Sequence, residues 1–145
     1  MVNTKETKGS CLCQSVKIKA KTMSLNVGAC HCNMCRKWTG GVFLAVECGS
    51  EVSFEGEDNI SVFNSSQWAD RGFCSKCGTN LYYRIKHNNQ YIIPAGLFEH
   101  DDGEFNFDHQ VFIDEKPPYY SFSNKTLNMT AAEVFAKYAP NSEST

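Results

Sequence analysis

Residues 74–78 read Cys74-Ser75-Lys76-Cys77-Gly78, two cysteines in one tight turn with a glycine directly after the second. Such a turn can direct both sulfurs at one metal ion, and the glycine lets the backbone turn close to the metal-bound sulfur. Tetrahedral zinc needs four ligands, so this pair requires a second one. Cys11-Leu12-Cys13 is the natural complement if Leu12 points away. We therefore predict a closed four-cysteine zinc site that joins distant parts of the sequence and stabilises the fold.

A second group of cysteines consists of Cys30, Cys32 and Cys35, with His31 between the first two. Three ligands and one open position are typical of a catalytic zinc. Three thiolates leave the ion with a net charge of about −1, so it is a weak Lewis acid that suits a bound thiolate better than hydroxide. The group therefore predicts chemistry at a carbon–sulfur bond, with a small thiol as substrate, rather than hydrolysis.

Other roles for these cysteines stay open at this point. The first group could form two disulfides or remain as four thiols, and the second could be redox-active. The second group could also be a structural site closed by Cys48 or a histidine. Cys48 lies in an apolar run, which favours a buried thiol. Adjacent side chains of an extended segment point in opposite directions, which argues against His31 as the fourth ligand.

The composition indicates a globular protein of one domain. The chain has 145 residues, of which 41% are hydrophobic, 12% are aromatic and eight are cysteines. Lys and Arg number 14 against 16 Asp and Glu, which argues against a nucleic-acid partner. No apolar run approaches the roughly 18 residues of a membrane span, and the first residues lack the apolar core of a secretory signal. We expect a cytoplasmic protein without a membrane partner, in which clustered thiols stay reduced.

Short apolar or alternating segments between turn residues predict a mainly β fold of short antiparallel strands. The expected strands cover residues 16–21, 41–48, 51–55, 60–63, 80–85, 90–93 and 110–113, with a hairpin loop at residues 87–89. Thr130 and Glu133 form a capping box that begins one short C-terminal helix, which ends before Pro140. We expect flexible tails at residues 1–8 and 140–145, around a single domain over residues 9–139.

Candidate substrate-binding residues lie next to the cysteine groups in the sequence. They are Arg36, Lys37, Trp38 and Arg71. Each basic residue could pair with a carboxylate of the thiol substrate or lie in a solvated turn. The tryptophan could line a pocket or pack in the core. The histidines that we expect at the surface are His87, His100 and His109.

Three motifs follow one another along the chain. They are Gly9-Ser10-Cys11-Leu12-Cys13, Cys30-His31-Cys32-Asn33-Met34-Cys35-Arg36-Lys37 and Phe73-Cys74-Ser75-Lys76-Cys77-Gly78-Thr79. In order and spacing they resemble the glutathione-dependent formaldehyde-activating enzyme family, also called the CENP-V/GFA domain. Phe112-Ile113 and Lys116-Pro117-Pro118-Tyr119 are similar to the C-terminal segment of that family. The resemblance runs from about Gly9 to about Tyr120.

The resemblance implies a β-tent zinc-binding fold with two zinc ions per chain. It implies a structural zinc held by Cys11, Cys13, Cys74 and Cys77, and a catalytic zinc held by Cys30, Cys32 and Cys35. It further implies a carbon–sulfur lyase similar to S-hydroxymethylglutathione synthase, acting on an adduct of glutathione and formaldehyde. Two alternatives stand beside it, a non-catalytic zinc module that binds a protein and a redox or metal-handling protein.

Overall fold

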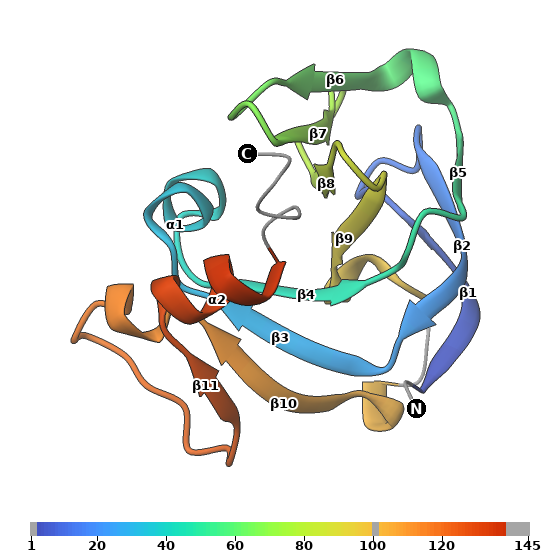
Figure 1. Ribbon diagram of the computed structural model, residues 1–145. Coiled ribbons are helices and arrows are strands. Elements are labelled where there is room, and N and C mark those ends of the chain that lie inside the picture. Colours follow the sequence, from blue (N-terminus) through green and yellow to red (C-terminus); the bar gives the residue numbers. More distant parts are fainter. Residues whose placement is uncertain (1–2, 100–101, 139–145) are drawn as a thin grey trace. The chain divides into compact units, whose positions relative to one another are not determined.

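The computed structural model describes residues 3–99 and 102–138. They belong to two compact units: unit 1 comprises Met1–Asn26 and Ala45–Asn106, and unit 2 comprises Val27–Leu44 and Phe107–Thr145. The strands (Figure 1) are β1 (Thr4–Ser10), β2 (Lys17–Ser24), β3 (Asn26–Cys30), β4 (Phe43–Glu47), β5 (Val52–Glu55), β6 (Ile60–Phe63), β7 (Ala69–Cys74), β8 (Asn80–Ile85), β9 (Gln90–Pro94), β10 (Asn106–Val111) and β11 (Leu127–Met129). The α-helices are α1 (Asn33–Thr39) and α2 (Ala131–Tyr138).

Unit 1 contains two sets of antiparallel strands. In the first, β2 lies between β1 and β5, and its exposed lysines alternate with the buried side chains of Ile18 and Ala20. In the second, β9, β8, β7 and β6 are neighbours in that order. Gly72 of β7 lies opposite Tyr82 of β8, and the tyrosine ring occupies the space that a Cβ atom at Gly72 would need. Glycine is therefore required where these two strands meet.

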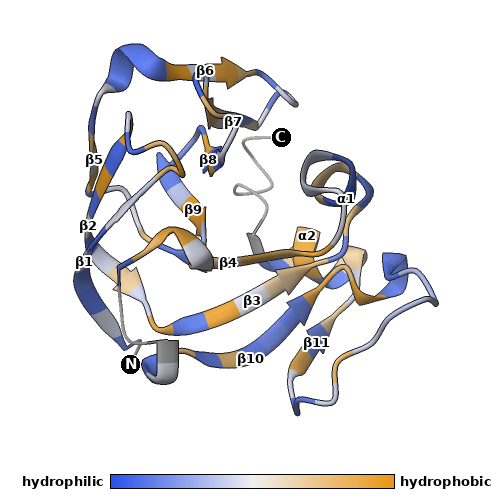
Figure 2. Cartoon of the chain, turned by 180° about the vertical axis from the view of Figure 1, so that it is seen from behind, coloured by the Kyte–Doolittle hydropathy of each residue, from blue (hydrophilic) through white to orange (hydrophobic). Residues whose placement is uncertain are grey.

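β4 is the predicted apolar strand of residues 41–48, and it passes from unit 2 into unit 1 between Leu44 and Ala45. It is apolar along most of its length (Figure 2). In unit 1, Val46 is 1% exposed and Cys48, just after the strand, is fully buried. The part of β4 in unit 1 pairs with β9, where Val46 lies opposite Ile93. This pairing places the apolar run in the core.

Unit 2 contains β3, β10, β11 and both α-helices. β11 is parallel to β10, with His109 opposite Leu127. β3 lies on the other side of β10, and the His109 ring packs against Gly28 where a Cβ atom would otherwise stand. After β10 the chain turns at Phe112, whose φ of 56° is unusual for a bulky residue. The Phe112 ring packs edge-on against Phe135 of α2, with 5.6 Å between the ring centroids.

The capping box at the start of α2 is confirmed. Glu133 N–H donates to Thr130 Oγ1 at 3.2 Å, and Thr130 N–H donates to Glu133 Oε1 at 2.8 Å. These reciprocal bonds satisfy amides that the first helical turn leaves without a partner. Among the helices of residues 3–99 and 102–138, none has the length and apolar character that crossing a lipid bilayer requires.

The predicted fold class, mainly β with a short C-terminal helix, is confirmed. Several details differ. The predicted tail at residues 1–8 is wrong from Thr4 onward, because β1 begins there and pairs with β2. The predicted strand at residues 110–113 coincides only with the end of β10, which runs from Asn106 to Val111, and β10 pairs with β11 in parallel. The tail at residues 140–145 lies outside the described residues, and both the single domain over residues 9–139 and the β-tent arrangement stay predictions.

Candidate metal centres

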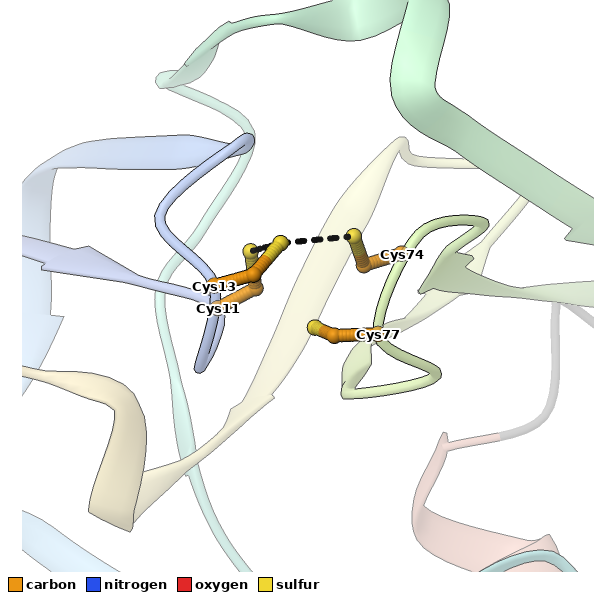
Figure 3. A group of neighbouring side chains, drawn as sticks. All are labelled: Cys11, Cys13, Cys74 and Cys77. Carbon is orange, nitrogen blue, oxygen red and sulfur yellow. Dashed lines mark hydrogen bonds between the residues drawn. The ribbon is translucent and has the colours of Figure 1, made fainter.

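Four cysteines of unit 1 point toward one another from two turns (Figure 3). Cys11 and Cys13 follow β1, and Cys74 and Cys77 lie at the turn between β7 and β8. All four Sγ atoms lie within 4.8 Å of one another, with 3.7 Å between Cys11 and Cys13 and 3.8 Å between Cys13 and Cys74. Zinc–sulfur bonds of about 2.3 Å in a tetrahedron place sulfurs about 3.8 Å apart. The spacing therefore fits one metal ion held by four thiolates.

Thr79 connects the two cysteine turns. Its Oγ1 accepts a hydrogen bond from Leu12 N–H at 3.1 Å and lies 3.1 Å from Cys77 Sγ. Since the hydroxyl already accepts from Leu12, its own proton is available to the sulfur. This hydrogen bond is the largest of several, with backbone N–H groups of Thr79 and Cys13 among the others, that lower the pKa of Cys77 to about 5. Metals bind thiols in the thiolate form, so Thr79 favours the state that this cluster needs as a ligand set.

Gly78 closes the Cys-x-x-Cys turn, as the sequence predicted. Its φ is +79°, in the left-handed region that glycine adopts without strain, and its N–H donates to Cys74 O at 2.8 Å. A Cβ atom there would meet no atom within 4 Å beyond the chain neighbours. The backbone conformation thus accounts for the glycine after the second cysteine.

The second cluster, Cys30, Cys32 and Cys35, lies in unit 2. Cys30 ends β3, Cys32 caps the start of α1, and Cys35 lies in its first turn. Cys35 N–H donates to Cys32 Sγ at 3.3 Å, so the sulfur takes the place that a serine or aspartate oxygen usually has at a helix start. The three Sγ atoms lie within 4.8 Å of one another, and no fourth His, Cys, Asp or Glu among the described residues completes the group. This donor set fits a metal with an open position.

Burial differs among the three sulfurs. Cys35 is buried, whereas Cys30 and Cys32 are half-buried. Hydrogen bonds that the Cys30 thiol donates to Cys32 and Cys35 act with burial to raise the pKa of Cys30 far above its usual range. Three thiols this close resist ionisation together, and a cation among them has the opposite effect because it favours thiolates. By its own chemistry the cluster could therefore hold a cation.

His31 and Cys48 are outside both ligand groups, as the sequence predicted. Both ring nitrogens of His31 have protein partners, since Nδ1 lies 2.6 Å from Tyr120 Oη and Nε2 lies 2.8 Å from Gln110 Oε1. Burial lowers the pKa of this histidine. Cys48 is fully buried, which raises the pKa of its thiol to about 12.

The candidate substrate-binding residues next to the second cluster lie on α1. Arg36 is half-buried and its Nε donates to His31 O at 2.9 Å. Lys37 is exposed. Trp38 is half-buried and packs edge-on against Phe43, with 5.5 Å between the ring centroids. Of these side chains, Lys37 is the most accessible to a solute.

Arg71 belongs to β7 of unit 1, is 3% exposed and lies over the Tyr83 ring at 4.7 Å. Its role as a substrate contact stays a prediction. Among the histidines expected at the surface, His87 is exposed, whereas His109 is half-buried over Gly28 and lies 2.6 Å from Asp108. The expectation was wrong for His109 because the strand pattern of β10 does not show its contact with a distant glycine. His100 lies outside the described residues.

Known proteins resemble this chain over most of its length. The family model described as glutathione-dependent formaldehyde-activating enzyme matches residues 6–115. A Schizosaccharomyces pombe protein named an uncharacterized lyase is 39% identical over 130 residues, which cover 89% of this chain and 94% of that protein. A Podospora anserina protein, named as a candidate glutathione-dependent formaldehyde-activating enzyme, is 32% identical over 87 residues, or 56% of this chain and 40% of that protein.

A solved structure shares the fold. The crystal structure of a Rhodobacter sphaeroides protein superposes with a TM-score of 0.56 at 22% identity, and the match covers 65% of this chain and 89% of that one. At this identity the similarity concerns the backbone arrangement alone.

Proposed function

Since the chain belongs to the glutathione-dependent formaldehyde-activating enzyme family, we propose that it is a zinc-dependent carbon–sulfur lyase. Its substrate would be the adduct of a small thiol, such as glutathione, and an aldehyde such as formaldehyde. The observation that carries the proposal is the three-cysteine cluster, whose donor set leaves room for one more ligand. A thiol sulfur is the ligand that such a soft site prefers.

The reaction breaks one carbon–sulfur bond. The adduct hydroxyl loses its proton, a carbon–oxygen double bond forms, and the electron pair of the carbon–sulfur bond leaves with the sulfur; synthesis is the reverse. Zinc bound by Cys30, Cys32 and Cys35 would supply a soft Lewis acid that keeps the thiol ionised. Cys30 and Cys32 are half-buried, so the ligand set is accessible from solvent, while buried Cys35 anchors it to α1.

Basic side chains near this cluster suit a thiol that carries carboxylates. Lys37 is exposed one residue after Arg36, and both follow Cys35 on α1. We expect Lys37 to contact a substrate carboxylate directly, with Arg36 contributing positive charge while its Nε remains bonded to His31 O. Trp38 supports this turn of α1 through Phe43.

Cys32→Ser tests the proposal. Purified without a metal-affinity column, the wild-type protein should hold about two zinc ions per chain and accelerate the reaction of glutathione with formaldehyde above its spontaneous rate. The variant should lose this acceleration, because a serine is a poor zinc ligand, and should stay folded because the four-cysteine cluster is intact. NMR of the adduct measures the rate, and zinc per chain is measured on the same samples.

Cys48→Ala is the matched control, since Cys48 lies in neither cluster. It should keep both metals and the rate. Full activity in Cys32→Ser would exclude this mechanism. A wild-type protein with both metals, no rate and no affinity for small thiols would instead favour the protein-binding module.

A further inference from the structure

His31 separates two ligands of the three-cysteine cluster and points away from them. The chain is extended here, since Cys30 ends a strand and Cys32 has a φ of −64° and a ψ of 155°. Successive side chains of extended backbone alternate in direction. The exposures agree with this, because Cys30 and Cys32 are half-buried whereas His31 is 0% exposed. The imidazole therefore lies behind the two sulfurs, on the inner side of the chain.

The hydrogen bonds of the ring define its tautomer. Gln110 Nε2 donates to Thr126 Oγ1 at 2.9 Å, which places Gln110 Oε1 toward His31. That oxygen only accepts, so His31 Nε2 carries the proton and donates to it at 2.8 Å. Nδ1 is then the acceptor, and the Tyr120 hydroxyl donates to it at 2.6 Å. The ring thus joins the cluster segment to β10 and to the segment around Tyr120.

The backbone of His31 is held as firmly as its ring. Its N–H donates to Val111 O at 3.2 Å, at the end of β10, and its carbonyl accepts from Arg36 Nε at 2.9 Å. Four hydrogen bonds thus hold one residue between two ligands. Few rotations remain by which Cys30 or Cys32 could move relative to the other.

We propose that His31 is a positioning residue for the three-cysteine metal site. Its bonds to Tyr120 and Gln110 hold Cys30 and Cys32 in the arrangement that binds the ion. The inference rests on the proposed metal at this cluster, but needs no particular reaction there. Groups that orient metal ligands typically contribute about 10- to 100-fold in metal affinity.

The test replaces the hydrogen bonds of the ring in steps. His31→Phe keeps a flat ring without either bond. His31→Gln can place its amide N–H near the position of Nε2 and donate to Gln110, but its carbonyl oxygen then does not stand at the position of Nδ1, so the bond to Tyr120 is lost; Tyr120→Phe removes the same bond from the other side. The zinc affinity of the three-cysteine site is measured by competition with a chelating dye. Cadmium-113 NMR of the cadmium-loaded protein gives a separate resonance for each cluster.

We expect His31→Phe to lower the affinity of the three-cysteine site about 10- to 100-fold and to shift or broaden its cadmium resonance, with the four-cysteine resonance unchanged. The zinc affinities of His31→Gln and Tyr120→Phe should each lie between those of His31→Phe and wild type. If His31 supported the site only by its shape, His31→Phe would bind zinc more tightly than His31→Gln, since phenylalanine matches the imidazole ring better than glutamine does. Arg84→Met, which breaks the 2.7 Å pair with Asp70 in unit 1, controls for general destabilisation and should leave the three-cysteine resonance unchanged.

The outcomes separate this inference from the proposed function. If the wild-type protein gives two cadmium resonances and His31→Phe changes neither the zinc affinity nor the spectrum, this result would overturn the positioning role and leave the metal site in place. An equal loss of metal affinity at both clusters in His31→Phe would also overturn the positioning role. If His31→Phe does not fold, an unchanged three-cysteine site in Tyr120→Phe and His31→Gln overturns it. A single resonance in wild type would overturn the metal site itself, and with it the proposed lyase.

Discussion

The two cysteine clusters have the same ligand atoms but are held by the chain in different ways. The four-cysteine cluster joins a turn after β1 to a turn after β7, and its sulfurs come from parts of unit 1 that are far apart in sequence. The three-cysteine cluster comes from one short segment at the start of α1. A ligand set that joins distant segments stabilises the fold on binding metal, whereas a local one depends on the surrounding fold for its geometry.

The hydrogen bonds around the two clusters differ in the same way. In the four-cysteine cluster Thr79 links one turn to the other and donates to a ligand sulfur. In the three-cysteine cluster the bonds hold His31, which is not a ligand, and one amide of α1 reaches Cys32 Sγ. The first arrangement closes a site and the second keeps one accessible. Stability should therefore depend on the first cluster and activity on the second.

The largest expected effect is the loss of folding in Cys74→Ser. Cys74 is fully buried at the end of β7, and its sulfur helps to join the two strand sets of unit 1. Losing a ligand of the proposed structural zinc should lower the free energy of unfolding by about 4 kcal/mol or more. Urea unfolding followed by circular dichroism measures this.

Cys32→Ser is the matched comparison, because it makes the same substitution in the other cluster. It should change the free energy of unfolding by about 1 kcal/mol at most, as for a partly exposed site. If Cys74→Ser and Cys32→Ser lowered the free energy of unfolding equally, both clusters would stabilise the fold, and the expected difference in their roles would be wrong.

The sequence predicted what depends on local spacing. Cysteines two or three residues apart can reach one ion whatever the rest of the chain does, so the two pairs and the triplet were apparent, and the need for four ligands suggested joining the pairs; the structure brings each group together. Ile60–Phe63 and Asn80–Ile85 were predicted as strands with the observed bounds, because apolar residues lie between clear turns. Short-range patterns of this kind do not depend on tertiary contacts.

Elements that depend on distant partners were missed. β7 contains Asp70 and Arg71, which look like surface residues until Arg84 and Tyr83 of β8 are placed beside them. α1 was not predicted, since it has seven residues and a cysteine in place of an ordinary cap. The hydrogen-bond partners of His31 are Gln110 and Tyr120, which are distant in sequence, so the residues around His31 could not predict them.

A smaller effect is expected for Thr79→Val, which keeps the shape of the side chain and removes the hydroxyl between Leu12 N–H and Cys77 Sγ. That hydroxyl makes the largest contribution to the lowered pKa of Cys77, which is about 5, so without it the thiolate is protonated at a higher pH. Zinc should then leave the four-cysteine cluster at higher pH during acid titration, with affinity at neutral pH about 10-fold lower. Zinc release to a chromogenic chelator measures both.

Ser75→Ala is the control in the same turn, because the Ser75 hydroxyl donates to Asn59 O rather than to a ligand. It should release zinc at the wild-type pH. If Thr79→Val also shifts release from the three-cysteine cluster, the clusters are not independent and the comparison between them fails.

The smallest effect is expected at Cys48, which tests whether a cysteine outside both clusters is inert. Burial raises the pKa of its thiol from the ordinary 9.0 to about 12, so the folded protein holds this proton more tightly than the unfolded chain. The resulting stabilisation is complete below pH 9.0 and is lost as the pH rises toward 12. Cys48→Ala should lower the free energy of unfolding by about 1 kcal/mol at neutral pH.

The pH dependence then distinguishes burial from ligation. Titration of the seven cluster cysteines is common to both proteins, so the stability difference between wild type and Cys48→Ala should shrink between pH 9.0 and 12. Urea unfolding over this range measures it. A lower zinc content in Cys48→Ala would show instead that Cys48 closes the three-cysteine cluster as a fourth ligand, and that cluster would then be structural like the other.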